Sequence, residues 1–112
     1  TIKNFSIDPQ PVRARVRFQT DYGADPELVK STTITAIEKV DGIIDGTTTV
    51  VIRSIWDDDQ GHMLSGVLYE ARYRLLDVTT RTTLRSTVLE ILLREFKREG
   101  IEMASLPIRT LS

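Results

Sequence analysis

Few residues in this sequence have the chemistry of a catalytic site. The only histidine, His62, lies in a polar stretch typical of a turn, so any serine–histidine nucleophile system would depend on it alone. The absence of cysteine excludes a cysteine nucleophile, thiolate zinc ligands and a disulfide framework. No glycine-rich phosphate loop of the P-loop or dinucleotide type occurs. We therefore expect no catalytic residues, no cofactor and no enzyme activity.

Three consecutive aspartates, Asp57, Asp58 and Asp59, followed by His62, are the best candidate for a metal site. Hard cations need several oxygen ligands that converge on one point. Consecutive residues of an extended chain point in alternate directions, and the spacing is not that of a calcium-binding EF-hand loop. A solvated loop between two strands is the better interpretation, so we predict no bound metal.

Arginines at alternate positions are the most informative polar residues. Residues 12–20 place apolar side chains on one face and polar ones on the other, which is the period of a half-buried strand. The residues that lead up to Leu76 alternate in the same way. The polar faces of these two strands carry Arg13, Arg15, Arg17, Arg72 and Arg74. Because like charges on adjacent strands repel, this cationic face must be solvated, neutralised by local acids or turned toward a partner.

The elements that position these arginines are those of one α+β domain. Asp25-Pro26-Glu27 predicts a helix start, with an N-cap, a first-turn proline and an acid at the positive end of the dipole. Asp41-Gly42 predicts its end. Thr79 and Thr80 offer caps for a second helix, which ends at Gly100. Strands are predicted over residues 12–20, 47–55, from the aspartate loop to 76, and 101–106.

The resulting order, βαββαβ, is the ferredoxin-like arrangement. Right-handed crossovers place both helices on one face of an antiparallel four-stranded sheet, with strands one and three as central neighbours. An RNA-recognition module shares this topology but reads bases with aromatic residues on the open face. Here Phe18, Tyr69 and Tyr73 alternate onto the inward face, and the net charge is −1. We therefore expect no nucleic-acid partner.

The second helix has a wide apolar stripe. Leu89 and Leu93 extend that stripe to an arc of roughly 200°. Such width indicates either a thick core or a contact with another subunit, and both interpretations stay open here. Leu89 and Leu93 are therefore candidate subunit-interface residues.

The two ends of the chain differ from the domain between them. Residues 1–11 are expected to form a linker, since Asp8-Pro9 and Gln10-Pro11 hold the backbone extended. Residues 12–107 form the domain and residues 108–112 a tail. The chain begins at Thr1 without a signal-like segment, which we interpret as a piece of a larger protein. No apolar run approaches the ~20 residues that span a bilayer.

Three segments carry a resemblance to a known family. They are Thr1-Ile2-Lys3-Asn4-Phe5-Ser6, Asp21-Tyr22-Gly23-Ala24-Asp25-Pro26-Glu27-Leu28-Val29 and Arg94-Glu95-Phe96-Lys97-Arg98-Glu99-Gly100-Ile101-Glu102. In this order they resemble the exit from the preceding β domain, and then the helix start and the closing segment of the cytoplasmic carboxy-terminal α/β domain, in the small-conductance mechanosensitive channel (MscS) family. The resemblance covers about residues 2–107. The chain departs from the family at Met103-Ala104-Ser105-Leu106-Pro107, which lacks the usual aromatic residue and first proline.

The resemblance implies the vestibule and assembly domain of a homo-heptameric ion channel on the cytoplasmic side of the inner membrane. Its partners would be copies of itself and permeating ions and small solutes, released on hypo-osmotic stress. Transmembrane helices and a β domain would precede Thr1, and only those helices would contact the membrane. The alternative is a soluble ferredoxin-like regulatory module that binds a small ligand or pairs as a dimer. An enzyme on this fold ranks third, because no paired acid and base suggests one.

Overall fold

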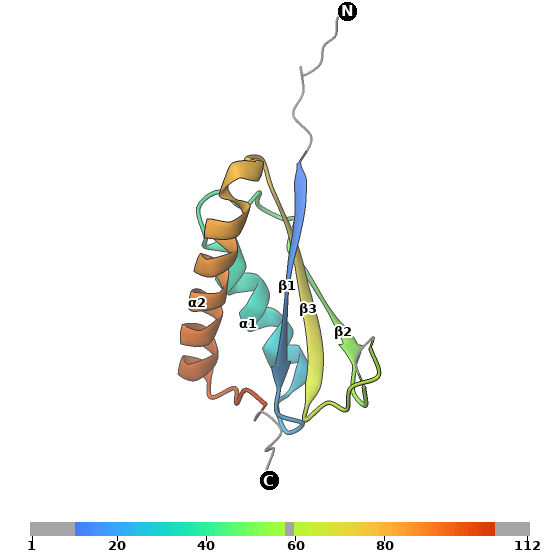
Figure 1. The fold of residues 1–112 in the computed structure, drawn as a ribbon. Coiled ribbons are helices and arrows are strands. Elements are labelled where there is room, and N and C mark those ends of the chain that lie inside the picture. Colours follow the sequence, from blue (N-terminus) through green and yellow to red (C-terminus); the bar gives the residue numbers. More distant parts are fainter. Residues whose placement is uncertain (1–10, 58–59, 105–112) are drawn as a thin grey trace, which may run out of the picture.

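The computed structural model describes residues 11–57 and 60–104. Its elements follow the chain in the order shown in Figure 1: β1 (Val12–Thr20), α1 (Pro26–Glu38), β2 (Thr49–Ser54), β3 (Val67–Leu75), the 3₁₀ turn η1 (Val78–Thr80) and α2 (Arg81–Glu99). The predicted α+β class is confirmed. Within the described residues, neither helix combines the length and apolar character needed to cross a bilayer.

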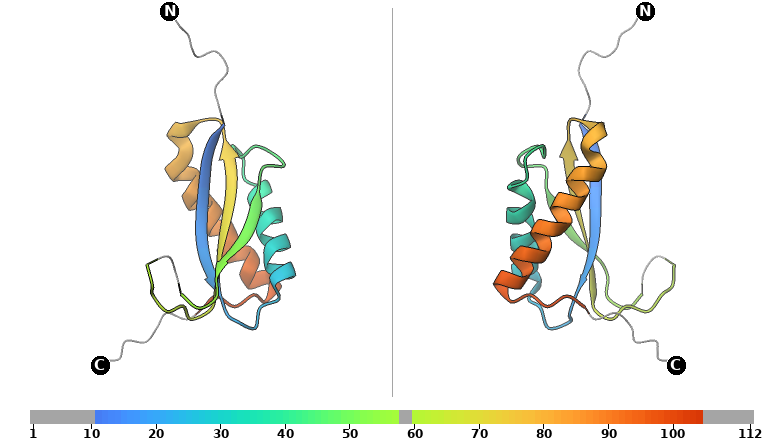
Figure 2. Two further views of the ribbon diagram at one scale, coloured as in Figure 1. Left: turned by 90° about the vertical axis from the view of Figure 1, so that its right-hand side faces the viewer. Right: turned by 60° about the vertical axis from the view of Figure 1, so that its left-hand side comes forward.

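The strands form one antiparallel sheet in the order β1-β3-β2. Both helices lie on the same side of this sheet, and the turned view in Figure 2 shows the other face without a covering helix. The predicted pairing of the first and third strands is present. However, β3 alone is central over the described residues, and β1 is an edge strand.

The predicted four-stranded ferredoxin-like sheet is not shown, because the described residues form only three strands. After Gly100 the chain makes one antiparallel bridge, between Met103 and Thr20, the last residue of β1. The amide of Asp21 donates to the carbonyl of Glu102 at 2.9 Å, and the amide of Ala104 donates to the carbonyl of Gln19 at 3.1 Å. Pairing begins too late for a strand over residues 101–104, and residues 105 and 106 lie outside the described residues.

The ends of α1 follow the prediction at one side only. Oδ1 of Asp25 accepts from the amide of Glu27 at 3.4 Å, as expected of an N-cap. The helix ends at Glu38, earlier than the predicted stop at Asp41-Gly42. The amides of Lys39 and Val40 donate to carbonyls three residues back, which tightens the last turn into a 3₁₀ form.

The start of α2 differs from the prediction that Thr79 and Thr80 cap it. Oδ1 of Asp77 accepts from the amide of Thr79 at 3.0 Å and from its hydroxyl at 2.6 Å, so Asp77 caps η1. Thr80 is the N-cap of α2 but makes no side-chain cap hydrogen bond to the described residues. Gly100 ends α2 in the left-handed conformation, as predicted, with φ at 75°.

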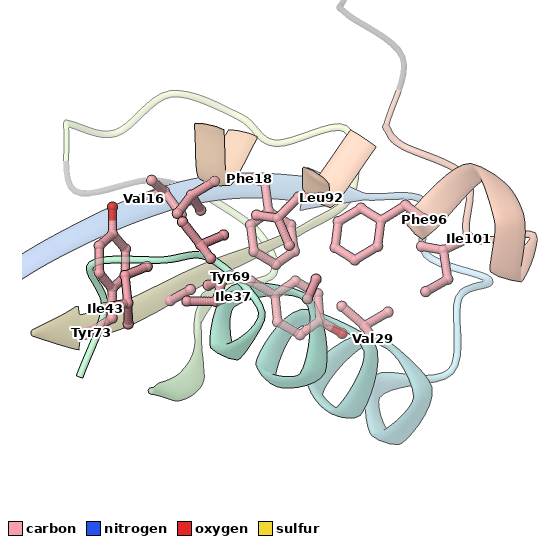
Figure 3. Close-up of a cluster of buried hydrophobic side chains, with 14 of the residues drawn as sticks. Val16, Phe18, Val29, Ile37, Ile43, Tyr69, Tyr73, Leu92, Phe96 and Ile101 are labelled. Atoms are coloured by element: carbon pink, nitrogen blue, oxygen red, sulfur yellow. The ribbon is translucent and has the colours of Figure 1, made fainter. Parts of the chain in front are cut away.

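The core lies between the sheet and the two helices (Figure 3). Phe18 stacks on Tyr69 with ring centroids 5.4 Å apart, and it meets Phe96 of α2 at 5.1 Å. The predicted inward residues of β1 and β3 do face this core. Burial of each large apolar side chain contributes roughly 1.5–3 kcal/mol to the stability of the fold. The apolar face of each strand therefore packs against the helices, and the arginines, which alternate with the apolar residues, lie on the opposite face.

Candidate functional site

The sheet face opposite the helices carries the predicted arginines. Strand register pairs Arg13 with Arg74, Arg15 with Arg72, and Arg17 with Glu70. All five arginines are exposed, whereas Glu70 is buried. We call the surface formed by Arg13, Arg15, Arg17, Arg53, Glu70, Arg72 and Arg74 the arginine face.

Glu70 is the one acid of the arginine face as defined, and its side chain is only 1% exposed. Its Oε1 accepts from Nε of Arg17 at 3.0 Å and from Nη1 of Arg53 at 3.4 Å, and its Oε2 accepts from Nε of Arg72 at 2.6 Å. Each of the three strands therefore sends one arginine to the same carboxylate. The alternation that places Arg72 and Arg74 on this face places Glu70 there too, but we did not predict its role as a shared acceptor or the contribution of Arg53.

Arg53 reaches Glu70 from an irregular part of β2. The register between β2 and β3 shifts between Ile52 and Ser54, which is the signature of a β-bulge. A bulge re-aims the side chain at the point where it occurs, and here it accompanies the contact of Arg53 with the central carboxylate. One feature of the sequence could have indicated that Glu70 neutralises the arginines: it is the one acid among the outward residues of the two alternating strands.

The charge state of Glu70 follows from two opposing effects. Burial alone would raise its pKa, because desolvation disfavours the carboxylate. Hydrogen bonds from Arg72 and Arg17, with the charges of Arg72 and Arg53, outweigh burial and hold the pKa below the usual value for glutamate. Glu70 is therefore ionised at neutral pH, and its negative charge offsets the repulsion between the arginines of the three strands.

The part of the arginine face beyond Glu70 has a different character. Arg13, Arg15 and Arg74 form no ion pair with a carboxylate among residues 11–57 and 60–104. They line a hollow together with the hydroxyl-bearing Thr47 and Thr49, and Arg53, Glu70 and Arg72 line the same hollow. A concave surface with this excess of cations concentrates anions near it.

The two candidate interface leucines lie in different surroundings on α2. Leu89 is partly buried and packs against the core, whereas Leu93 is 59% exposed. Leu93 borders a shallow apolar hollow together with Phe96, Ile101 and Met103. Leu93 is thus the one of the pair with surface free to meet another molecule.

The aspartate loop is only partly described. Asp57 bridges to Met63, and His62 is exposed, while Asp58 and Asp59 lie outside the described residues. In the part of the chain that the structure describes, no three histidine, aspartate or glutamate residues group as metal ligands would. The expectation that the loop binds no metal stays a prediction.

No family model matches the sequence, and no curated protein matches it. Among solved structures, the chain is similar to the one titled "Crystal Structure of Helicobacter pylori MscS (Closed State)". The TM-score is 0.71 at 20% sequence identity, and the match covers 91% of this chain. The chain has the fold of a part of MscS.

This likeness agrees with the resemblance to the MscS family indicated by the sequence. The chain matches 39% of the length of the Helicobacter pylori MscS chain. At 20% identity the comparison shows a shared fold.

Proposed function

We propose that this chain is the cytoplasmic vestibule and assembly domain of an MscS-like mechanosensitive channel. Such a channel would release ions and small solutes when a cell meets hypo-osmotic stress, and this domain would be non-catalytic. The observation that carries the proposal is the match of 91% of the chain to MscS of Helicobacter pylori at a TM-score of 0.71. The segments of sequence that resemble the MscS family support the proposal independently of this structural match.

Assembly would involve copies of this chain, as a homo-heptamer by resemblance to the family. Leu93 supports this role because a large apolar side chain on the exposed side of a helix favours contact with a partner. Leu89 would contribute its exposed part to the same contact, because the core covers this side chain only partly. The interface proposed here is therefore centred on Leu93 and edged by Leu89.

The arginine face would line the aqueous path in the vestibule. Its exposed cations produce a fixed positive potential, which raises the local concentration of anions and lowers that of cations. Glu70 limits this potential at one end of the face, while Arg13, Arg15 and Arg74 carry it at the other. We infer a modest preference for anions as the functional consequence.

The test is survival of osmotic downshock by cells that lack their own mechanosensitive channels. The full-length protein that contains this chain is expected to restore survival, and a form truncated before β1 serves as the control for the contribution of the domain. Lack of rescue by a protein shown to be present in the membrane would contradict the proposal. Recovery of the full-length protein in the soluble fraction would instead favour the regulatory-module alternative.

A further inference from the structure

A second hollow lies at the other side of β1, where the strand meets the start of α2. It has a volume of about 390 Å³ and is lined by Arg13, Ala14, Arg15, Tyr73, Arg81 and Arg85. Four of these six residues are arginines: two come from β1 and two from the first turns of α2. We call it the β1–α2 hollow. Arg13 and Arg15 also belong to the arginine face, whereas Arg81 and Arg85 have no role in the proposed function.

The four arginines lack acidic partners. None of them forms an ion pair with a carboxylate among the described residues. Nη2 of Arg81 donates to the backbone carbonyl of Arg13 at 3.0 Å, which holds the start of α2 against β1. Asp77 is the nearest acid in the sequence, but it caps η1 and does not line the hollow. The hollow is therefore cationic without internal compensation.

The helix adds to this positive potential. The amino-terminal end of a helix carries a partial positive charge, which acids stabilise and bases destabilise. The first turn of α2 contains no acid and begins with Arg81, and Arg85 follows one turn later. An anion in the hollow would be stabilised by the arginines and by the positive end of the helix dipole.

A buried hydroxyl beside the hollow has an unused capacity to donate a hydrogen bond. Tyr73 lies at one end of the core cluster (Figure 3), and its side chain is 1% exposed. Its hydroxyl is buried and has no hydrogen-bond partner among the described residues. Leaving a buried polar group unsatisfied destabilises the fold. Tyr73 also lines the hollow, so a small movement of the side chains around it would let its hydroxyl donate to an oxyanion bound there.

The position of this hydroxyl relative to the arginines is consistent with a shared ligand. Burial raises the pKa of Tyr73, and the charges of Arg85 and Arg81 act in the opposite direction. The hydroxyl therefore lies within the electrostatic reach of both arginines of α2. It is protonated at neutral pH and available as a donor.

We propose that the β1–α2 hollow binds a small phosphate-bearing anion, either inorganic phosphate or the phosphate group of a phosphomonoester. Guanidinium groups present forked donors that match phosphate oxygens, and several of them can neutralise a dianion. Tyr73 donates one further hydrogen bond. The site lies within this one domain, so it does not depend on the proposed channel function.

The experiment is isothermal titration calorimetry of the chain at constant ionic strength, with inorganic phosphate and glycerol 3-phosphate as separate probes and acetate as the control anion. The expected result is saturable binding of one phosphate per chain with a Kd of about 1 mM. A phosphate concentration of about 10 mM would then nearly saturate the site. Tighter binding of glycerol 3-phosphate identifies a phosphomonoester site, and equal or weaker binding identifies inorganic phosphate. Acetate should not bind.

Two variants and a matched control decide whether this binding occurs in the hollow. Arg85→Gln should weaken phosphate binding about tenfold, which corresponds to about 1.4 kcal/mol. Tyr73→Phe should weaken it about threefold or more, while the free variant unfolds at the same or a higher temperature because it lacks the orphan hydroxyl. Arg94→Gln, an exposed arginine of α2 outside the hollow, should bind as the parent does. Absence of binding, or equal loss in Arg94→Gln and Arg85→Gln, would overturn the proposal.

Discussion

Glu70 accepts a 2.6 Å hydrogen bond from Nε of Arg72, which lies two residues further along the same strand. Residues two apart in a strand point to the same face, so the arginine folds over the acid and helps to bury it. Arg17 and Arg53 approach the same carboxylate from the strands on either side. The arginine face is thus organised around one acid that three strands share.

Replacement of Glu70 by glutamine should destabilise the domain. Glu70→Gln keeps the shape of the side chain but removes the charge that three arginines share. We expect the free energy of unfolding to fall by about 1–3 kcal/mol, a range for hydrogen bonds to charged groups that allows for the partial exposure of the arginines. Urea denaturation followed by circular dichroism measures the change.

The matched control for this variant is Glu90→Gln, which removes the same charge from an exposed position on α2. A surface substitution of this kind is expected to change stability by less than about 0.5 kcal/mol. An equal loss in the two variants would show that net charge, and not the arginine cluster, accounts for the effect.

Acidification should reveal the same cluster. The pKa of Glu70 is lower in the folded chain than in the unfolded chain, so below the unfolded value the unfolded state binds more protons. The stability that Glu70 contributes is complete above about pH 4.3, the ordinary pKa of glutamate, and is lost as the pH falls through the folded pKa. An NMR titration of the Glu70 carboxyl carbon should give a midpoint below that ordinary value. A midpoint above it would mean that burial dominates over the arginines.

Alternation in the sequence was enough to predict the two faces of β1 and β3. Val16 and Phe18 are buried and Arg15 and Arg17 are exposed because the strand period is two and one face meets the helices. Alternation did not predict the burial of Glu70. That burial depends on Arg53, whose position relies on the bulge in β2, and a bulge is a property of the paired strands and not of one segment.

At the helix ends, features set by neighbouring residues could be predicted, and features set by the folded chain could not. The N-cap Asp25 could be identified because a cap, a proline and an acid follow one another in the sequence. Asp77 was missed because the side chain caps a 3₁₀ turn that precedes α2, which moves the start of the helix to Arg81. The fourth strand was predicted from apolar residues after Gly100, but pairing with β1 begins only at Met103.

Gly66 should not tolerate a side chain. A Cβ at this position would collide with the carbonyl oxygen of Thr20 and approach the Cβ of Ala104 to 2.9 Å. Both neighbours belong to the junction of β1 with the segment after α2, so the backbone would have to shift. We expect Gly66→Ala to lower the free energy of unfolding by about 1–3 kcal/mol.

The control for Gly66→Ala is Gly23→Ala, where the added Cβ meets only Oδ2 of Asp21 at 3.4 Å. This substitution should be neutral or slightly stabilising, because it reduces the entropy of the unfolded chain. Equal stability of the two variants in chemical denaturation would show that Gly66 does not pack closely against Thr20 and Ala104.

Self-assembly should depend on Leu93. An unpaired charge in an apolar contact costs more than the ~1–3 kcal/mol of an unpaired neutral polar group, so Leu93→Asp in the full-length protein should weaken oligomers about tenfold or more. Thr87→Asp adds the same charge on another face of α2 and should leave assembly unchanged. Native mass spectrometry of the purified protein distinguishes the two results. Unchanged oligomers in Leu93→Asp would remove this residue from the interface.

Ion preference should depend on the arginine face. Joint replacement of Arg13, Arg15 and Arg17 by glutamine removes three positive charges from β1. The reversal potential of the full-length channel in a salt gradient should then shift toward the value for cations, because the local anion excess falls. Replacement of Arg94 by glutamine, on an exposed part of α2, is the control and should cause no shift. A reversal potential that the triple variant leaves unchanged would make these arginines purely structural.

The most direct test of the channel proposal is a recording of membrane patches that contain the full-length protein while suction raises the tension. The account predicts a current that is absent at rest, appears above a threshold of tension and closes when the suction is released. Immunolabelling would verify that the protein is present in each patch. If suction then evokes no more current than in protein-free patches, the channel proposal is contradicted.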